Sequence, residues 1–170
     1  MKAQKFSLLI VDDDEDDRFF LEKAFHALGP HYQIHAITNG DEAIAYIQGL
    51  GKYRNREDFQ FPSYIITDLK MSPGNGFDLL NFIKKNPALS IIPVVMLSSS
   101  CDPDDVRHAY LLGASSFFTK PSSSAQLGSL VKSIHEYWSQ CQVPAVDEAG
   151  FAVHTNSKGK AGEPFPKPNC

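Results

Sequence analysis

Residues 65–76, with the sequence IITDLKMSPGNG, decide the fold predicted for this chain. Apolar β-forming residues end in Asp68, and a loop of Ser, Pro, Gly and Asn residues follows directly, as after a buried strand. Asp68 is therefore predicted at the carboxyl end of a central strand. In open α/β sheets, ligands and reacting groups collect at this end of the strands. A lone aspartate there is often only a turn residue, so its meaning depends on the rest of the chain.

Four more strands are predicted around this one, and helices alternate with them. Short apolar runs predict strands over residues 6–11, 32–37, 64–67, 91–97 and 116–119. Apolar residues at helical spacing predict helices that include residues 20–28, 43–47, 77–83, 106–110 and 127–138. Strands that alternate with helices imply a parallel sheet covered by helices on both faces, so the fold class is α/β.

Local signals refine two of these helices. Asp102 followed by Pro103 combines a cap residue with proline at the first helical position, and Tyr110 is predicted on the buried side of that helix. Ser123 with Gln126 three residues later predicts a capping box at the start of the last helix.

Two segments lack a strand or helix pattern. Residues 49–61 form a polar connection with glycine and arginine, which predicts a surface loop. From about Cys141, prolines and glycines appear without apolar periodicity, so residues 1–140 are predicted to form the folded domain and residues 141–170 a disordered tail.

Size, charge and cysteine content narrow the function classes. A chain of 170 residues suggests one domain, large enough to fold without a disulfide or a structural metal. The net charge of −4 gives no reason to expect nucleic-acid binding. The three cysteines have no zinc-site spacing, and neither a signal peptide nor a membrane-spanning run is seen. A reduced cytoplasmic setting, with no nucleic-acid or membrane partner, is the simplest interpretation.

Polar side chains follow four of the five predicted strands: Asp12 and Asp13, Asp68, Ser98 and Lys120. Because parallel strands end at one edge of the sheet, these groups should meet there. Three close carboxylates require a cation, and oxygen ligands suit magnesium. With the Lys120 ammonium and the Ser98 hydroxyl, the set has the parts needed for phosphoryl transfer to an aspartate. The acids at 14–17 are instead predicted to begin a helix and face solvent.

In the order and spacing of these residues, the chain resembles the receiver domain of response regulators in two-component signalling. The resemblance covers residues 6 to about 138, and it is carried by Val11-Asp12-Asp13, Thr67-Asp68-Leu69-Lys70-Met71 with Gly76, Leu97-Ser98, Gly113-Ala114 and Lys120-Pro121. It implies a flavodoxin-like sheet with strand order 2-1-3-4-5. The long 49–61 connection resembles that of single-domain receivers paired with phytochrome-type kinases.

The resemblance also implies a phosphoacceptor and a metal site. Asp68 would accept the phosphoryl group. Asp12 and Asp13 would bind Mg²⁺ together with Asp68, with Asp13 favoured as the direct ligand, and the backbone carbonyl of Lys70 would be a further ligand.

The switch positions follow from the same resemblance. Ser98 would move toward the phosphoryl group, Lys120 would pair with it, and Phe117 occupies the position of an aromatic switch residue, although a core phenylalanine is its ordinary interpretation. The Lys120–Pro121 peptide is expected to be cis.

The function implied is a stand-alone phosphoacceptor switch rather than an enzyme, promoting only its own phosphorylation and dephosphorylation. A histidine kinase or phosphotransfer protein would supply the phosphoryl group. The output surface would be formed by the helix after Asp102, the strand 116–119 and the helix after Ser123, and this surface could also form a homodimer.

Two alternatives stay open at this point. A magnesium-dependent phosphatase of the haloacid dehalogenase type would use Asp12, Asp14, Ser98 and Lys120. The residues after Asp14 do not fit that family, and its later acidic pair could come only from the tail. The other alternative is a binding module that is never phosphorylated, which the complete set of polar groups disfavours.

Overall fold

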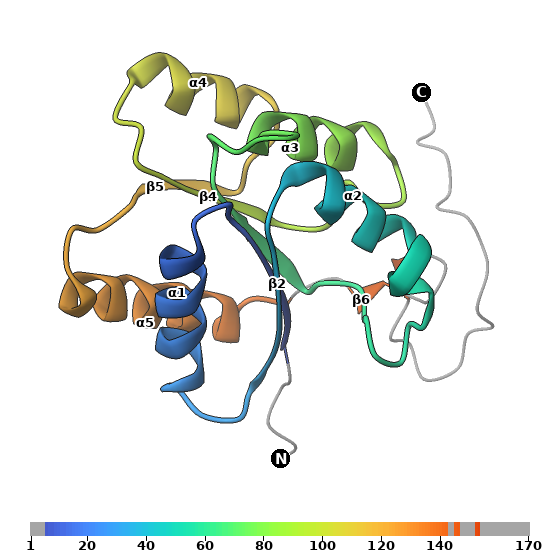
Figure 1. Ribbon diagram of the computed structural model, residues 1–170, viewed down its shortest axis with the longest axis horizontal. Coiled ribbons are helices and arrows are strands. Elements are labelled where there is room, and N and C mark those ends of the chain that lie inside the picture. Colours follow the sequence, from blue (N-terminus) through green and yellow to red (C-terminus); the bar gives the residue numbers. More distant parts are fainter. Residues whose placement is uncertain (1–5, 143–144, 147–151, 154–170) are drawn as a thin grey trace.

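A computed structural model describes residues 6–142, 145–146 and 152–153 (Figure 1). Strands and helices alternate as β1 (Phe6–Val11), α1 (Glu15–His26), β2 (Tyr32–Ile37), α2 (Gly40–Gln48), η1 (Gly51–Arg54), β3 (Tyr64–Thr67), α3 (Gly76–Lys85), β4 (Val94–Ser98), α4 (Pro103–Leu111), β5 (Ser116–Thr119) and α5 (Ser124–Gln140).

The main sheet has five strands in the order β2-β1-β3-β4-β5, and each neighbouring pair is parallel. This confirms the predicted α/β fold and strand order. Helices α1 and α5 cover one face of the sheet, and α2, α3 and α4 cover the other (Figure 1). The strand order reverses between β1 and β3, so the loops after these two strands diverge and leave room for a site at their carboxyl ends.

Strand β1, between β2 and β3, shows why the sheet lies between two helical layers. All six of its residues are buried. Leu9 and Val11 pack in the cluster that contains residues of α2 and α3, whereas Leu8 and Ile10 pack in the cluster that contains residues of α1 and α5. A strand with apolar side chains on both faces gains hydrophobic burial from both layers, which favours a place inside the sheet over a place at its edge.

Two predictions of element detail were wrong. Strand β4 begins at Val94 rather than at residue 91, because the Ile92 N–H donates to the Leu89 carbonyl in a turn after α3. Tyr110 is 51% exposed, while Ala109 is fully buried. The helical period turns Ala109 to the sheet, and the Tyr110 hydroxyl accepts a hydrogen bond from the Phe117 N–H at 3.2 Å.

Two further local expectations also fail. Among the described residues the one cis peptide is Ser72–Pro73, so Lys120–Pro121 is trans, the lower-energy form of an X-Pro bond. Only half of the predicted capping box forms at α5. Ser123 Oγ accepts from the Gln126 N–H, but the Gln126 side chain accepts from the Ser122 hydroxyl instead.

The connection 49–61 is packed against α2, rather than being only a surface loop. Tyr53 in η1 is buried, and its hydroxyl donates to the Glu42 carboxylate at 2.6 Å. The Arg56 guanidinium donates to the carbonyls of Tyr46 at 2.8 Å and Ile47 at 2.6 Å. These carbonyls lie in the last turn of α2, where helical partners run out, so Arg56 closes the end of that helix.

Most of the predicted tail, 141–170, lies outside the described residues. In its described part, β6 (Ala145–Val146) pairs antiparallel with β7 (Ala152–Val153), which differs from the disorder predicted for these residues. Valine favours extended pairing, and the sequence pattern was too short to indicate it. Among the described residues, none of the helices combines the length and apolar character needed to cross a membrane.

We predict that Arg56→Ala lowers the free energy of unfolding by about 1–3 kcal/mol, because it leaves partly buried helix carbonyls without their charged donor. Urea denaturation followed by circular dichroism measures this. Arg54→Ala is the matched control, since Arg54 is exposed and close in sequence. Equal stability of the two variants would contradict the role given to Arg56.

Candidate functional site

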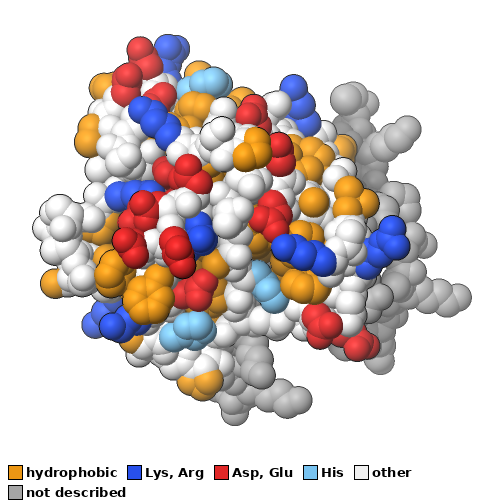
Figure 2. Space-filling model, viewed as in Figure 1, with side chains coloured by type: hydrophobic (Ala, Val, Ile, Leu, Met, Phe, Trp, Pro, Cys, Tyr) orange, Lys and Arg blue, Asp and Glu red, His pale blue; other side chains and the backbone are white. Residues whose placement is uncertain are grey.

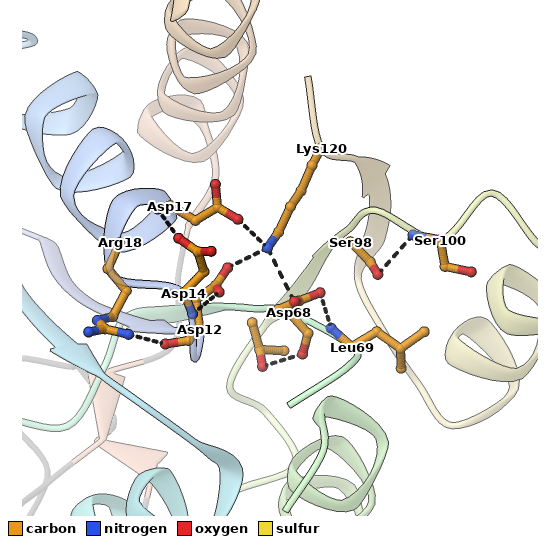
Figure 3. Close-up of polar contacts among 10 residues, drawn as sticks. Asp12, Asp14, Asp17, Arg18, Asp68, Leu69, Ser98, Ser100 and Lys120 are labelled. Carbon is orange, nitrogen blue, oxygen red and sulfur yellow. Dashed lines mark hydrogen bonds and ion pairs between the residues drawn. The ribbon is translucent and has the colours of Figure 1, made fainter. Parts of the chain in front are cut away.

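The carboxyl ends of four strands bring the predicted polar groups to one edge of the sheet. Asp12 follows β1, Asp68 follows β3, Ser98 ends β4 and Lys120 follows β5. Figure 3 shows the four side chains around one small volume, with Lys120 reaching across from β5 toward the aspartates. The parallel sheet therefore assembles groups that lie up to 108 residues apart in the sequence (from Asp12 to Lys120).

The Lys120 ammonium is the centre of the site. Its Nζ lies 2.7 Å from Asp12 Oδ2, 2.7 Å from Asp17 Oδ2 and 3.1 Å from Asp68 Oδ2. Asp12 and Asp68 are 5% and 6% exposed, so neither carboxylate can rely on water to stabilise its charge. A lysine ammonium has three N–H donors, and three carboxylates surround this one.

Burial and pairing act in opposite directions on the protonation of these groups. Burial raises the pKa of Asp12, and the hydrogen bond and charge of Lys120 offset only part of this effect. Burial alone would lower the pKa of Lys120, but hydrogen bonds to Asp12 and Asp17, with the charges of Asp12 and Asp68, outweigh it and raise that pKa above its ordinary value. Lys120 is therefore a permanent cation at neutral pH.

The Asp68 carboxylate is held at both oxygens. Oδ1 accepts from the Leu69 N–H at 2.6 Å, and Oδ2 faces Lys120. The loop after Asp68 returns close to it, since the Gly76 N–H donates to the Leu69 carbonyl at 2.9 Å. A Cβ atom at Gly76 would lie 2.2 Å from the Asp68 carbonyl oxygen, so only glycine allows this close approach.

The Ser98 hydroxyl is fully buried and engaged with the following loop. Ser98 Oγ accepts from the Ser100 N–H at 3.2 Å, and Ser100 Oγ donates to Asp105 Oδ2 at 2.5 Å. Phe117 is half-buried on β5 and packs against the core cluster shared with α2, α3 and α4. These contacts connect the ends of β4 and β5 to α4.

Three acids could hold a metal ion. Asp12, Asp13 and Asp68 each offer a carboxylate oxygen, and these atoms lie within 4.8 Å of one another. Such an all-oxygen set suits a hard divalent cation. Asp13 is exposed, and among the described residues no ion pair involves it. Lys70 is exposed in the loop after β3, and its carbonyl stays a predicted ligand.

Sequence reasoning missed Asp17. It was predicted to face solvent within the acidic start of α1, yet its side chain is only 46% exposed and contacts Lys120. Asp14 is the N-cap of α1 and accepts from the Asp17 N–H at 3.0 Å, which sets Asp17 in the first turn at the edge of the site. The sequence did contain one signal for this role of Asp17, because the turn directly follows β1, whose end forms part of the site.

The family model described as the response regulator receiver domain matches residues 8–132. Response regulator Rcp1 of Synechocystis is 30% identical over 131 residues, covering 77% of this chain and 87% of that protein. The crystal structure of the phosphorylated cyanobacterial phytochrome response regulator RcpA has a TM-score of 0.77 at 31% identity, covering 83% of this chain and 99% of the other. The Mn²⁺-bound form of Rcp1 has a TM-score of 0.75 at 29% identity, covering 82% and 99% of the two chains.

We predict that Asp13→Asn raises the melting temperature in EDTA by about 2–5 °C, because it removes one of three crowded charges. Adding Mg²⁺ should stabilise the wild-type protein more than this variant, because the variant lacks one anionic ligand. Thermal unfolding with and without Mg²⁺ measures both effects, and Asp16→Asn is the control for loss of an exposed acid. If Mg²⁺ raises the melting temperature of all three proteins equally, Asp13 has no part in metal binding.

Proposed function

Because this chain belongs to the family of response regulator receiver domains, we propose that it is a phosphoryl-accepting switch whose acceptor is Asp68. The single observation that best supports this is the Asp68 carboxylate itself. It is buried, directly follows the central strand β3, lies 3.1 Å from a lysine ammonium and shares its edge of the sheet with Asp12 and Asp13. A carboxylate nucleophile needs such compensation of charge to receive an anionic group.

In the proposed reaction, an Asp68 oxygen attacks phosphorus and the bond between phosphorus and the donor nitrogen or oxygen breaks. The Leu69 N–H holds Oδ1 in place, which orients the carboxylate toward the incoming group. Lys120 pairs with a phosphoryl oxygen as the charge on Asp68 is taken up in the new bond.

A divalent cation held at this site would supply positive charge to neutralise phosphoryl oxygens. We propose Mg²⁺ as this ion, held by Asp12, Asp13, Asp68 and the Lys70 carbonyl. The oxygen-only donor set fits such a hard ion, and the Mn²⁺-bound form of Rcp1 supports divalent metal binding in a relative.

The output is proposed to run through Ser98 and Phe117. Ser98 would exchange its bond from the Ser100 N–H for a bond to the phosphoryl group, and the loop before α4 would follow. The α4-β5-α5 surface carries exposed Tyr110, Leu111 and Tyr137, which suits recognition by a target protein or by a second copy of the chain.

The phosphodonor is proposed to be a histidine kinase or a phosphotransfer protein. Similarity to the phytochrome response regulator RcpA favours a kinase of the phytochrome type. The relatives Rcp1 and RcpA, of which this chain spans 87% and 99%, are named as response regulators, and we propose that the chain acts like them as a phosphoacceptor switch.

We predict that incubation with acetyl phosphate and Mg²⁺ adds one phosphoryl group to the wild-type protein and none to Asp68→Asn, since an amide cannot form the acyl phosphate. Intact-mass spectrometry measures this, and hydroxylamine should remove the added group. Asp104→Asn, an exposed acid on α4, is the control and should be modified like the wild type.

A phosphoryl group on Asp68→Asn would contradict this assignment. Steady hydrolysis of a phosphate ester by that variant would instead support a metal-dependent phosphatase.

A further inference from the structure

Asp17 contacts the lysine that pairs with the proposed phosphoacceptor. Its Oδ2 lies 2.7 Å from Lys120 Nζ, as close as Asp12 Oδ2 and closer than Asp68 Oδ2 at 3.1 Å. Figure 3 shows Asp17 on the first turn of α1, reaching Lys120 from the side opposite Asp68. The acid comes from a helix, whereas the other two carboxylates come from strand ends.

Two local bonds fix this first turn of α1 over the site. Asp14 accepts from the backbone N–H of Asp17 at 3.0 Å. The Arg18 guanidinium donates to the Asp12 carbonyl at 2.7 Å, which ties the helix to the end of β1. These bonds hold the backbone of Asp17 at a fixed place beside the site, from which its side chain contacts Lys120.

The number of N–H donors on Lys120 links Asp17 to the phosphorylation of Asp68. The three carboxylates around the ammonium match its three N–H donors. Phosphorylation frees the N–H that faced the Asp68 carboxylate, but the ammonium can move onto a phosphoryl oxygen only if its contact with Asp12 or Asp17 loosens. Asp12 is almost fully buried, but the Asp17 side chain is 46% exposed and can be solvated by water. Asp17 is thus the partner that costs least to release.

We infer that Asp17 is a positioning residue that holds Lys120 in the unphosphorylated protein and thereby restrains phosphorylation of Asp68. This inference rests on the proposed phosphoacceptor function. The Asp17 carboxylate acts in two ways. It holds the Lys120 ammonium on the side away from Asp68, and it adds negative charge where an anionic phosphodonor must approach. Figure 2 shows acidic side chains gathered on the face that includes α1.

The competing explanation is structural, because an acid in the first turn also stabilises a helix. Asp16 provides the matched control, since it lies in the same turn and is exposed, and it makes no ion pair among the described residues. If Asp17 acts only through the helix, Asp16→Asn and Asp17→Asn should have equal effects on every property measured.

The contact itself is tested without any phosphodonor. The free energy of unfolding in EDTA is measured for the wild type, Asp17→Asn, Lys120→Met and the double variant. We expect Asp17→Asn to destabilise the wild type but to stabilise the Lys120→Met background, where Asp17 only repels Asp12 and Asp68. The same change in both backgrounds would overturn the inferred contact.

The restraint is tested by the rate of phosphorylation with acetyl phosphate and Mg²⁺. Asp17→Asn should be phosphorylated about two- to fivefold faster than the wild type, the range expected for loss of one partly exposed ion pair. Asp16→Asn and the charge-conserving Asp17→Glu should stay near the wild-type rate. The gain should be smaller with phosphoramidate, which carries less negative charge than acetyl phosphate.

A rate for Asp17→Asn equal to or below that of the wild type would overturn the inference while leaving the proposed function intact. Failure of the proposed function looks different, because then no variant, including the wild type, would gain a phosphoryl group at Asp68. The unfolding measurements separate these cases, since they report the Asp17–Lys120 contact whether or not phosphorylation occurs.

Discussion

The burial of two carboxylates at one edge of a parallel sheet is the constraint on which the rest of this structure depends. Asp12 and Asp68 are nearly inaccessible to water, and a pair of like charges in such a place is unfavourable without a cation. Lys120 supplies that cation from the end of β5, two strands away from β3. Every other feature of the site follows from how this charge is shared.

The same edge is connected to the outer surface by a short series of contacts. Ser98 accepts from the Ser100 N–H, Ser100 donates to Asp105, and Asp105 lies in the first turn of α4. Farther along α4, Tyr110 accepts from the backbone of Phe117 on β5. A change of partner at Ser98 would therefore alter the loop that begins α4. These contacts link the end of β4, on the same edge of the sheet as the proposed phosphoacceptor, to the α4-β5-α5 surface.

The sequence allowed the sheet and most of the site to be predicted because these rest on strong local patterns. Apolar runs of β1 and β3 end abruptly in Asp12 and Asp68, and parallel pairing brings such ends together. The features that were missed depend on tertiary contacts. Arg56 was predicted to lie in a surface loop, but it donates to carbonyls at the end of α2. Asp17 was predicted to be a solvated acid, but it contacts Lys120. A local sequence pattern does not show which distant helix carbonyl or lysine ammonium a side chain will contact in the folded protein.

Chemical mapping of the phosphorylated residue tests the central claim most directly. The protein is incubated with acetyl phosphate and Mg²⁺, reduced with borohydride, which converts phosphoaspartate to homoserine, and digested for peptide sequencing by mass spectrometry. We expect homoserine at position 68 and at none of the other aspartates of the site. Homoserine at position 12, 13 or 17, or a stable phosphoryl group on a histidine or serine with none at 68, would contradict the account.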